Sequence, residues 1–574
     1  MRRLLGSSCG WLLTGLLLLA GGCGSSSPAT PSGAGGSPGT GGSPGSGGSP
    51  PIGTPIEPGD PGAADVTFTI RTDMDVHPIS PLIYGWNGAD ALATDGQTVV
   101  RAGGNRWTAY NWENNASNAG SDYMFQNDNY LDKSTAPGDA VKSTLDAAKT
   151  NSIAALITVP IVDYVAADTS PGGDVDPTHM HKGGDYLTTR FKPNKPTKGS
   201  AFSLTPDATD GAVYQDEFVN WVKTSYGAQQ VIFSLDNEPD LWSGTHAEVH
   251  PDAVTYAELV MRNTQYGAAV KAVWPTAEVA GFVSYGWYGY ETLQNAPDSK
   301  TNGEFLTYYL DQMKAAEQTA GKRLVDYLDL HWYPETYATD GYMGSTSPTR
   351  ITDQQDPSAQ IQAARLQAPR SLWDPNYNEN NWIAQGLGGP IKLIPRLKAK
   401  IAAHYPGTKL SISEYCFGGG HDISGGVTQA DVLGIFGREG LDMATAWEWP
   451  DSQMGNVYEI AGLQVFRNFD GHGATFGDTS IHAVTTDDSA SSVYASVSGA
   501  DVDRVVLVAI NKKTTAATAA IKLAHPTEFH TAAVYTLTAA GPTLMSAPAI
   551  TAVATNAFNY TMPPLSVSVL VPTR

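Results

Sequence analysis

Two glutamates each follow a short apolar run, in the manner of side chains that a barrel presents at its mouth. Glu238 comes just after Val231–Leu235, and Glu414 comes directly after Lys409–Ser413. In a parallel barrel, side chains at the C-terminal ends of the strands converge on one face. Two carboxyl groups about 5 Å apart on that face are what cleavage of a glycosidic bond with retention of configuration requires. A lone glutamate at a strand end is more commonly an ion-pair partner, but two at these positions favour a nucleophile and a proton donor.

The neighbours of the two glutamates fit these roles. Asn237, directly before Glu238, can donate a hydrogen bond to a sugar hydroxyl. His331 and Tyr333, at the end of another apolar run, are candidate donors that would keep the nucleophile ionised. Burial among aromatic residues beside a second carboxylate would raise the pKa of the proton donor.

The elements that must position these residues follow a regular rhythm. Eight apolar runs alternate with longer stretches of helical character, which predicts a (β/α)8 barrel, a TIM-like α/β fold. A doubly wound sheet gives a similar rhythm, but no glycine-rich phosphate-binding motif follows the first run. The eight runs are Leu82–Trp86, Thr98–Arg101, Ile153–Val159, Val231–Leu235, Glu278–Val283, Val325–His331, Lys409–Ser413 and Met443–Trp447.

The C-terminal part of the chain has a different pattern. Short strand-like runs at Val505–Ile510, Ala532–Leu537 and Leu565–Val571 are separated by turn residues, which predicts a small antiparallel β-sandwich. The alternating run Val66–Ile70 precedes the barrel, and we expect it to pair into this sandwich. A structural role for the sandwich is favoured over carbohydrate binding. The domains predicted in this way are a signal peptide (1–23), a linker (24–64), the N-terminal strand of the sandwich (65–80), the catalytic barrel (81–470) and the β-sandwich (471–574).

The N-terminus is typical of an exported protein. Arg2 and Arg3 precede the apolar stretch Trp11–Ala20, which is too short to span a bilayer as a mature helix. Leu19–Cys23 resembles a lipobox, which predicts a lipid on Cys23 and a cell-surface or extracellular location; an ordinary cleaved secretion signal is the alternative. The following segment consists largely of Gly, Ser, Pro and Thr, so we expect a disordered tether.

Composition narrows the range of partners. The 574-residue chain has a net charge of −22, which argues against nucleic acid and gives no reason to expect binding to anionic lipid except through a lipid anchor. A neutral polysaccharide suits its aromatic content, although most aromatic residues in any protein are packing residues. Cys416 is the one cysteine of the globular part, so no internal disulfide is expected there. We expect a monomer.

Several separate motifs, in order along the chain, resemble glycoside hydrolase family 44. They are Arg101-Ala102-Gly103-Gly104-Asn105, Tyr110-Asn111-Trp112, Asn118-Ala119-Gly120-Ser121-Asp122-Tyr123, Asn237-Glu238-Pro239-Asp240-Leu241-Trp242, His331-Trp332-Tyr333-Pro334, Ser371-Leu372-Trp373-Asp374-Pro375, Glu414-Tyr415-Cys416-Phe417-Gly418-Gly419 and Arg467-Asn468-Phe469-Asp470-Gly471. The resemblance covers Val66 to the C-terminus. It implies a retaining endo-β-1,4-glucanase or xyloglucanase on a barrel plus β-sandwich, with Glu238 as acid/base and Glu414 as nucleophile.

Further site residues are expected around this pair. Besides Asn237, His331 and Tyr333, we expect Asn105, Trp332 and Trp447 to contact substrate, the two tryptophans by stacking on sugar faces. Two positions depart from the family pattern: Ala102 stands where Trp is usual, and Cys416 stands where Asn is expected. We interpret Cys416 as a small apolar residue of the barrel wall rather than a group near the sugar.

No cofactor is expected to be required. The resemblance is compatible with a structural calcium or zinc, but the segment with Asp174, Asp176, His179 and His181 has no recognisable ligand spacing, and an exposed polar loop is favoured. Two alternatives to the endoglucanase stay open: a non-catalytic surface glycan-binding lipoprotein, and a related retaining barrel enzyme that acts on xylan or mannan.

Overall fold

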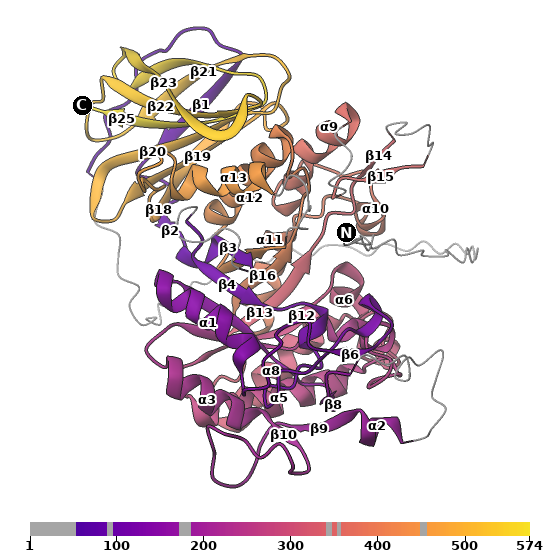
Figure 1. Ribbon diagram of the computed structural model, residues 1–574. Helices are drawn as coiled ribbons and strands as arrows, with labels where there is room; N and C mark the ends of the chain where they lie inside the picture. The colour runs from indigo at the N-terminus through magenta and orange to yellow at the C-terminus, as the bar shows by residue number, and fades with distance from the viewer. Residues whose placement is uncertain (1–52, 89–95, 171–184, 340–346, 353–357, 448–455) are drawn as a thin grey trace, which may run out of the picture. The chain divides into compact units, whose positions relative to one another are not determined.

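A computed structural model describes residues 53–88, 96–170, 185–339, 347–352, 358–447 and 456–574 (Figure 1). The described residues all belong to one compact unit of the chain. The signal peptide, Cys23, most of the linker, and the segment from Asp174 to His181 lie outside the described residues. Among the described helices, none is long and apolar enough to cross a membrane.

Eight parallel strands close into a barrel in the order β11-β12-β13-β16-β17-β3-β4-β7. Each of the eight predicted apolar runs supplies one strand, so the predicted TIM-like barrel is confirmed. The first strand starts latest relative to its predicted run: Pro81–Ile83 forms a 3-10 helix because the Ser80 hydroxyl caps the Leu82 N–H and Pro81 cannot donate to a ladder. The strands are β3 (Gly85–Asn87), β4 (Val99–Ala102), β7 (Ala154–Val159), β11 (Val231–Leu235), β12 (Glu278–Ser284), β13 (Tyr327–Trp332), β16 (Lys409–Tyr415) and β17 (Met443–Ala446).

A helix of nine or more residues lies between each barrel strand from β4 to β16 and the next barrel strand, and another follows β17. In α5, for example, Thr255 caps the Glu258 N–H, a local start signal that precedes the apolar positions. These helices are α1 (Asp139–Asn151), α3 (Gln215–Tyr226), α5 (Tyr256–Val273), α8 (Phe305–Ala320), α9 (Ala359–Gln367), α11 (Leu393–His404), α12 (Ile423–Arg438) and α13 (Val457–Arg467). Short helices lie in the connections: α2 (Tyr186–Thr189), α4 (Trp242–Thr245), α6 (Trp287–Thr292), α7 (Ser299–Asn302) and α10 (Trp382–Leu387).

Short strands also lie in the connections between barrel strands. They are β5 (Ser117–Asn118), β6 (Asn127–Asp128), β8 (Tyr164–Ala166), β9 (Phe191–Lys195), β10 (Val213–Tyr214), β14 (Tyr337–Ala338) and β15 (Thr349–Arg350).

The second β-structure is a sandwich with its own apolar core, which includes Phe68, Ile70 and Leu507. Its strand β1 (Val66–Arg71) pairs antiparallel with β18 and parallel with β21, so the first folded strand of the chain lies among the last ones. The parallel pair is a difference from the purely antiparallel sandwich that the sequence predicted. The other strands are β2 (His77–Pro78), β18 (Thr479–Thr485), β19 (Ser491–Ser498), β20 (Asp501–Asn511), β21 (Ala517–Ala524), β22 (Thr531–Thr538), β23 (Gly541–Ala554), β24 (Ala557–Met562) and β25 (Ser566–Thr573).

Helix α12 joins the barrel to the sandwich. Every residue from Ile423 to Gly437 is buried, because the helix packs on the barrel and also contacts six strands of the sandwich. Gly434 lets the sandwich approach closely, since a Cβ there would lie 2.2 Å from the Tyr494 ring. Asp431 on the same helix accepts a 2.6 Å hydrogen bond from Tyr494 and pairs with Lys512 at 2.8 Å. The sandwich is therefore part of the support of the barrel.

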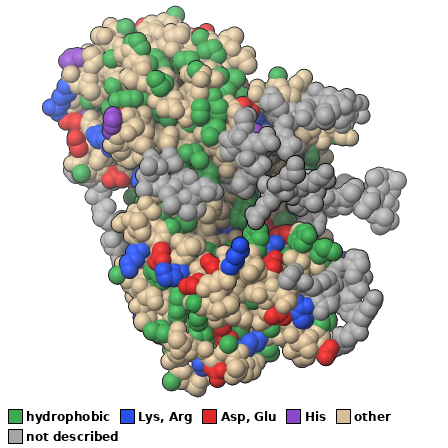
Figure 2. Space-filling view, in the orientation of Figure 1, with side chains coloured by type: hydrophobic (Ala, Val, Ile, Leu, Met, Phe, Trp, Pro, Cys, Tyr) green, Lys and Arg blue, Asp and Glu red, His purple; other side chains and the backbone are tan. Residues whose placement is uncertain are grey.

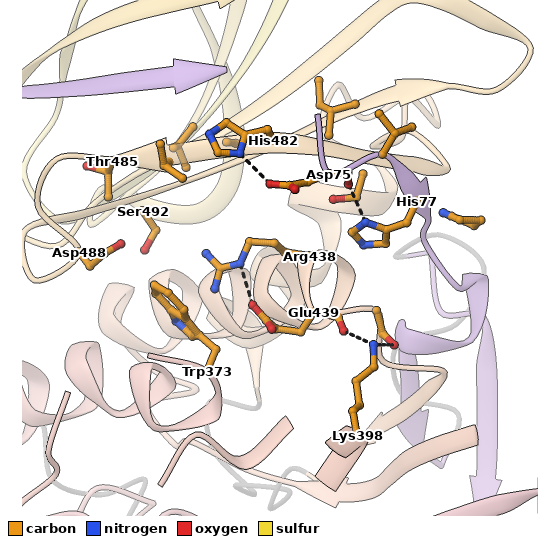
Figure 3. A pocket seen from close by; sticks show the side chains of 18 residues that line it. Asp75, His77, Trp373, Lys398, Arg438, Glu439, His482, Thr485, Asp488 and Ser492 are labelled. Carbon is orange, nitrogen blue, oxygen red and sulfur yellow. Dashed lines mark hydrogen bonds and ion pairs between the residues drawn. The ribbon is translucent and has the colours of Figure 1, made fainter. Parts of the chain in front are cut away.

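A groove of about 910 Å³ runs along this junction, between β18 and the C-terminal end of α12 (Figure 3). Inside it the Arg438 guanidinium lies 3.9 Å from the centre of the Trp373 ring. On the sandwich side, His482 Nδ1 lies 2.7 Å from a carboxylate oxygen of Asp75. On the face drawn in Figure 2, acidic and basic side chains intermingle over the barrel and uncharged ones dominate the sandwich.

Candidate active site

Glu238 lies in a tight turn directly after β11. Asp236 and Glu238 have positive φ angles, 70° and 45°, a conformation that costs energy for residues other than glycine. Hydrogen bonds to the neighbouring strands hold this turn. The Asp236 carboxylate accepts the Ile161 N–H at 2.7 Å, and the Glu238 N–H donates to the Val283 carbonyl at 2.9 Å. The turn projects Glu238 into the mouth of the barrel, where its side chain stays 21% exposed.

Glu414 lies near the end of β16 and is only 5% exposed. One carboxylate oxygen accepts a hydrogen bond of 2.6 Å from Arg101 Nη1, and the other accepts one of 2.9 Å from the Tyr333 hydroxyl. Charged acceptors form the stronger hydrogen bonds, so both donors stabilise the ionised carboxylate. The geometry suits a nucleophile.

Arg101 is a fully buried cation at the end of β4, and the sequence analysis assigned it no role. Besides Glu414, its guanidinium donates to Asn87 Oδ1 at 2.8 Å and to Asn237 Oδ1 at 3.0 Å. Gly103 makes room for it, because a Cβ there would lie 2.3 Å from the guanidinium carbon. The one sequence signal was an arginine inside an apolar strand, which indicates a buried partner of opposite charge.

His331 bridges the two glutamates. Its Nδ1 lies 2.8 Å from a carboxylate oxygen of Glu238 and 3.4 Å from one of Glu414. Its Nε2 lies 3.5 Å from Arg101 Nη2, which can only donate, so Nε2 accepts and Nδ1 carries the proton. Burial lowers the pKa of His331 to about 4, so the ring is neutral at pH 7.

The two carboxyl groups are close, and their environments differ. Oxygens of Glu238 and Glu414 and a nitrogen of His331 all lie within 4.8 Å of one another. Burial raises the pKa of Glu238 to about 7, with Arg101 opposing the rise and the negative charge of Asp122 adding to it. Glu238 can therefore hold a proton near neutral pH while Glu414 keeps two donors, as retaining cleavage of a glycoside requires.

Of the other predicted site residues, the contacts of Asn237 fit its expected role, while the roles of Trp447 and Asn105 stay predictions. Asn237 accepts from Arg101 through its oxygen, which orients its amide nitrogen. The half-buried Trp447 ring lies against Gly104 beside the mouth, and its contact with sugar stays a prediction. The Asn105 side-chain nitrogen donates a hydrogen bond of 3.5 Å to the Ala119 carbonyl within the loop after β4, and substrate contact by Asn105 also stays a prediction.

The prediction that Trp332 stacks on a sugar is wrong. Trp332 follows His331 in β13, so it points to the opposite side of the strand, where it is 2% exposed in the apolar core. Cys416 is also buried, as Glu414 and Arg101 are, and its role as a wall residue stays a prediction.

Comparisons with known proteins agree with this geometry. The profile of glycoside hydrolase family 44 matches residues 116–336, which include Glu238 and His331. Endoglucanase A of Paenibacillus lautus is 39% identical over 525 residues, which are 88% of this chain and 72% of that protein. The crystal structure of Cel44A, a family 44 endoglucanase from Clostridium thermocellum, is 40% identical with a TM-score of 0.81, and the match covers 89% of this chain and 100% of that one.

The chain belongs to glycoside hydrolase family 44. A further solved member, a Paenibacillus polymyxa xyloglucanase with xyloglucan, is 39% identical with a TM-score of 0.82 over 89% of this chain and 99% of that one. These matches span both the barrel and the sandwich.

Aromatic side chains also lie in the loops that follow the strands of this family 44 barrel, and the strand pattern did not reveal them. Tyr288 and Trp382 stack with ring centres 4.4 Å apart, and Trp382 Nε1 donates to Glu335 at 3.2 Å. Tyr123 and Tyr130, 55% and 73% exposed, lie in the loop after β4. All four come from connections that follow the C-terminal ends of strands, where loops of a barrel carry the binding residues.

The described residues give no basis for assigning a metal. Glu238, His331 and Glu414 have the closeness of a ligand group, but the Arg101 guanidinium already supplies the positive charge at this place. The structural calcium or zinc therefore stays a prediction without an assigned site.

The pH dependence of kcat/KM tests the assignment of the proton donor. Hydrolysis should decline as the pH rises through about 7, because Glu238 then loses the proton that the leaving group needs. Initial rates on a soluble glucan at subsaturating concentration, from pH 4 to 10, measure this limb. A variant Glu238→Gln should lack it, and a wild-type limb above pH 9 would contradict the assignment.

Proposed function

We propose that this family 44 glycoside hydrolase is a retaining endo-β-1,4-glucanase that cleaves internal bonds of cellulose-like glucans or xyloglucan. The observation that carries the proposal is the pair Glu238 and Glu414, with oxygens within 4.8 Å of His331 and of each other at the barrel mouth. Two relatives, an endoglucanase and a xyloglucanase with xyloglucan, support the substrate class.

In the first step, the Glu414 carboxylate attacks the anomeric carbon and displaces the leaving sugar, whose oxygen takes the proton of Glu238. The product is a glycosyl ester on Glu414. In the second step, Glu238 takes a proton from a water molecule, and the resulting hydroxide displaces Glu414 from the anomeric carbon. The two inversions give net retention.

The surrounding groups have separate tasks. Arg101 and Tyr333 hold Glu414 in place for attack and stabilise its charge before and after each turnover. Neutral His331 donates to Glu238 without adding a second positive charge. The oriented amide of Asn237 is placed to bond the 2-hydroxyl, a bond that strengthens as the sugar approaches the oxocarbenium ion.

The aromatic side chains of the loops, Tyr123, Tyr130, Tyr288 and Trp382, are called the aromatic rim here. They support cleavage inside a polysaccharide chain rather than at its end. The rim lies on loops from different sides of the barrel, after β4 on one side and after β12 and β13 on the other. A polymer can therefore contact aromatic faces on both sides of the cleaved bond. Trp447, beside Gly104 next to the catalytic pair, is our candidate for the central platform.

Two alternatives to an endoglucanase are a glycan-binding protein without catalysis and a related enzyme that acts on xylan or mannan. Both carboxylates and their donors are in place, which disfavours a purely glycan-binding protein. Action on xylan or mannan is harder to distinguish, because an aromatic ring stacks on any pyranose face.

A panel of soluble polysaccharides decides between these substrates. Carboxymethyl cellulose, xyloglucan, xylan, mannan and lichenan are scored for new reducing ends and for loss of viscosity. We expect the β-1,4-glucans to be cleaved fastest, with a rapid loss of viscosity, because cuts inside the chain shorten it at once. A Glu414→Gln variant is the blank. Faster cleavage of xylan or mannan would reject the proposed substrate class.

Chemical rescue tests Glu414 as the nucleophile. Glu414→Ala should abolish hydrolysis, and azide or formate should restore turnover of an activated aryl glycoside with inverted product, because the small anion enters the space of the lost carboxylate. NMR of the product gives its configuration. Retention of more than a few per cent of activity by Glu414→Ala would contradict the role.

We also propose that Cys23 carries lipid and anchors the enzyme at the cell surface, outside the described residues. The apolar stretch Trp11–Ala20, the lipobox-like Leu19–Cys23 and the Gly/Ser/Pro segment behind it support this location. A single acyl chain binds membranes only marginally, whereas several chains hold firmly. The segment from residue 24 to 64 would then act as the tether.

Detergent partitioning of the expressed protein tests the anchor. Wild-type protein should enter the detergent phase, and Cys23→Ser should move to the aqueous medium with unchanged activity, because the catalytic site is built from residues from Asn87 onward. The N-terminal residue of the mature protein is measured by mass spectrometry. Soluble wild-type protein that begins beyond Cys23 would indicate an ordinary secreted enzyme.

A further inference from the structure

Asp240 is a buried acid two residues after Glu238 that has no place in the chemistry above. It is 5% exposed. Its carboxyl group accepts a hydrogen bond of 2.6 Å from the Ser284 hydroxyl and one of 3.3 Å from the Tyr285 backbone N–H. The space around it is fitted to it, since a Cβ on Gly289 would lie 2.0 Å from its oxygen.

The surroundings of Asp240 favour the uncharged form. Among the described residues, no Lys, Arg or His forms an ion pair with it, and the titratable groups that face it are Glu238 on its own turn and Tyr285 and Tyr290 from the segment after β12. A buried carboxyl group without a cationic partner is more stable when protonated. Burial raises the pKa of Asp240 to about 8, with the hydrogen bond from the Ser284 hydroxyl opposing the rise and the charge of Glu238 adding to it.

Asp240 connects the catalytic turn to the next strand of the barrel. The Glu238 N–H already donates to the Val283 carbonyl in β12, and Asp240 adds contacts to the two following residues, Ser284 and Tyr285. These two connections hold Glu238 in a left-handed backbone conformation, which costs energy for a residue other than glycine.

We propose that Asp240 is a positioning residue for Glu238: as a neutral carboxylic acid it ties the turn that carries the acid/base to the end of β12 through Ser284 and Tyr285. The inference rests on the proposed role of Glu238 as acid/base. The neutral form matters because an ionised Asp240 would place a second negative charge next to Glu238 and disfavour its ionisation in the second step. A displacement of a catalytic group by 1 Å can cost roughly 10²-fold in rate, so a lost tie should affect proton transfer strongly.

Aryl cello-oligosaccharides with good and poor leaving groups test the proposal, with kcat/KM as the readout of the first step. Asp240→Ala should slow the poor leaving group by roughly 10²-fold and the good one much less, because only the poor one needs the proton. Glu238→Ala is the reference for this pattern, with a loss of about 10² to 10⁴ on the poor leaving group. Asp240→Asn, neutral and of the same shape, should recover most of the rate that Asp240→Ala loses.

The pH profile distinguishes a neutral from an ionised Asp240. With a neutral Asp240, Asp240→Asn keeps the alkaline limb of kcat/KM at its wild-type position. If Asp240 were ionised, removing its charge would lower the pKa of Glu238 and move the limb to lower pH, which would overturn the neutral form. Ser284→Ala, which removes only the partner hydroxyl, should show a weaker version of the Asp240→Ala pattern and serves if Asp240→Ala does not fold.

Two controls separate the possible failures. Asp442 accepts the Leu410 N–H at 2.8 Å near the start of β16, at the opposite end of the barrel, so Asp442→Ala reports what loss of a supporting carboxyl does by itself. It should slow both substrates alike or neither. Equal slowing of both substrates by Asp240→Ala would overturn the positioning role. If Glu238→Ala also fails to discriminate the leaving groups, the proposed acid/base role fails instead.

Discussion

The buried ion pair between Arg101 and Glu414, 2.6 Å long, is the interaction on which the rest of the site depends. The same guanidinium orients Asn237 and lies beside His331, so one cation sets the positions of groups from three other strands. Removing one partner of a buried pair leaves an uncompensated charge, at a cost of about 3–5 kcal/mol. Arg101 is on β4 and Glu414 on β16, with two strands between them around the barrel, so only a closed barrel lets them meet.

The two glutamates differ in chemistry because their surroundings differ. Glu414 receives hydrogen bonds from a cation and a phenol, which favour its ionised form. Glu238 faces a neutral histidine and is desolvated by burial, so it holds a proton close to neutral pH. This separation of two like groups by environment is what acid catalysis beside a nucleophile needs.

Helices and loops have different roles around the barrel. Helix α12 is buried along almost its whole length between barrel and sandwich, and it holds the strand that carries Glu414 from behind. The aromatic rim comes from loops, where the stacked pair Tyr288 and Trp382 is anchored by Glu335. Asp240 joins the turn that carries Glu238 to the beginning of the loop after β12, which carries Tyr288.

The sequence alone determined the architecture and the two carboxylates. Eight apolar runs gave eight barrel strands, and Glu238 and Glu414 could be picked out because strand ends and local motifs are properties of short segments. The alternation of Val66–Ile70 likewise gave the strand that pairs into the sandwich.

Only the tertiary structure decided which side chains meet. Ser411 and Ser413 hydroxyls face Asp329, so a regular strand would turn Glu414 the other way. The register between β13 and β16 shifts at this point, and the irregularity brings Glu414 next to His331. Trp332 was expected at the substrate together with His331, although neighbouring residues of a strand point to opposite sides, so only one of the two could face the mouth. Some residues act through partners that are far away in the sequence: Arg101, Asp240 and the pair Tyr288 and Trp382. Barrel closure and loop packing bring these partners together, and a short sequence pattern does not predict either.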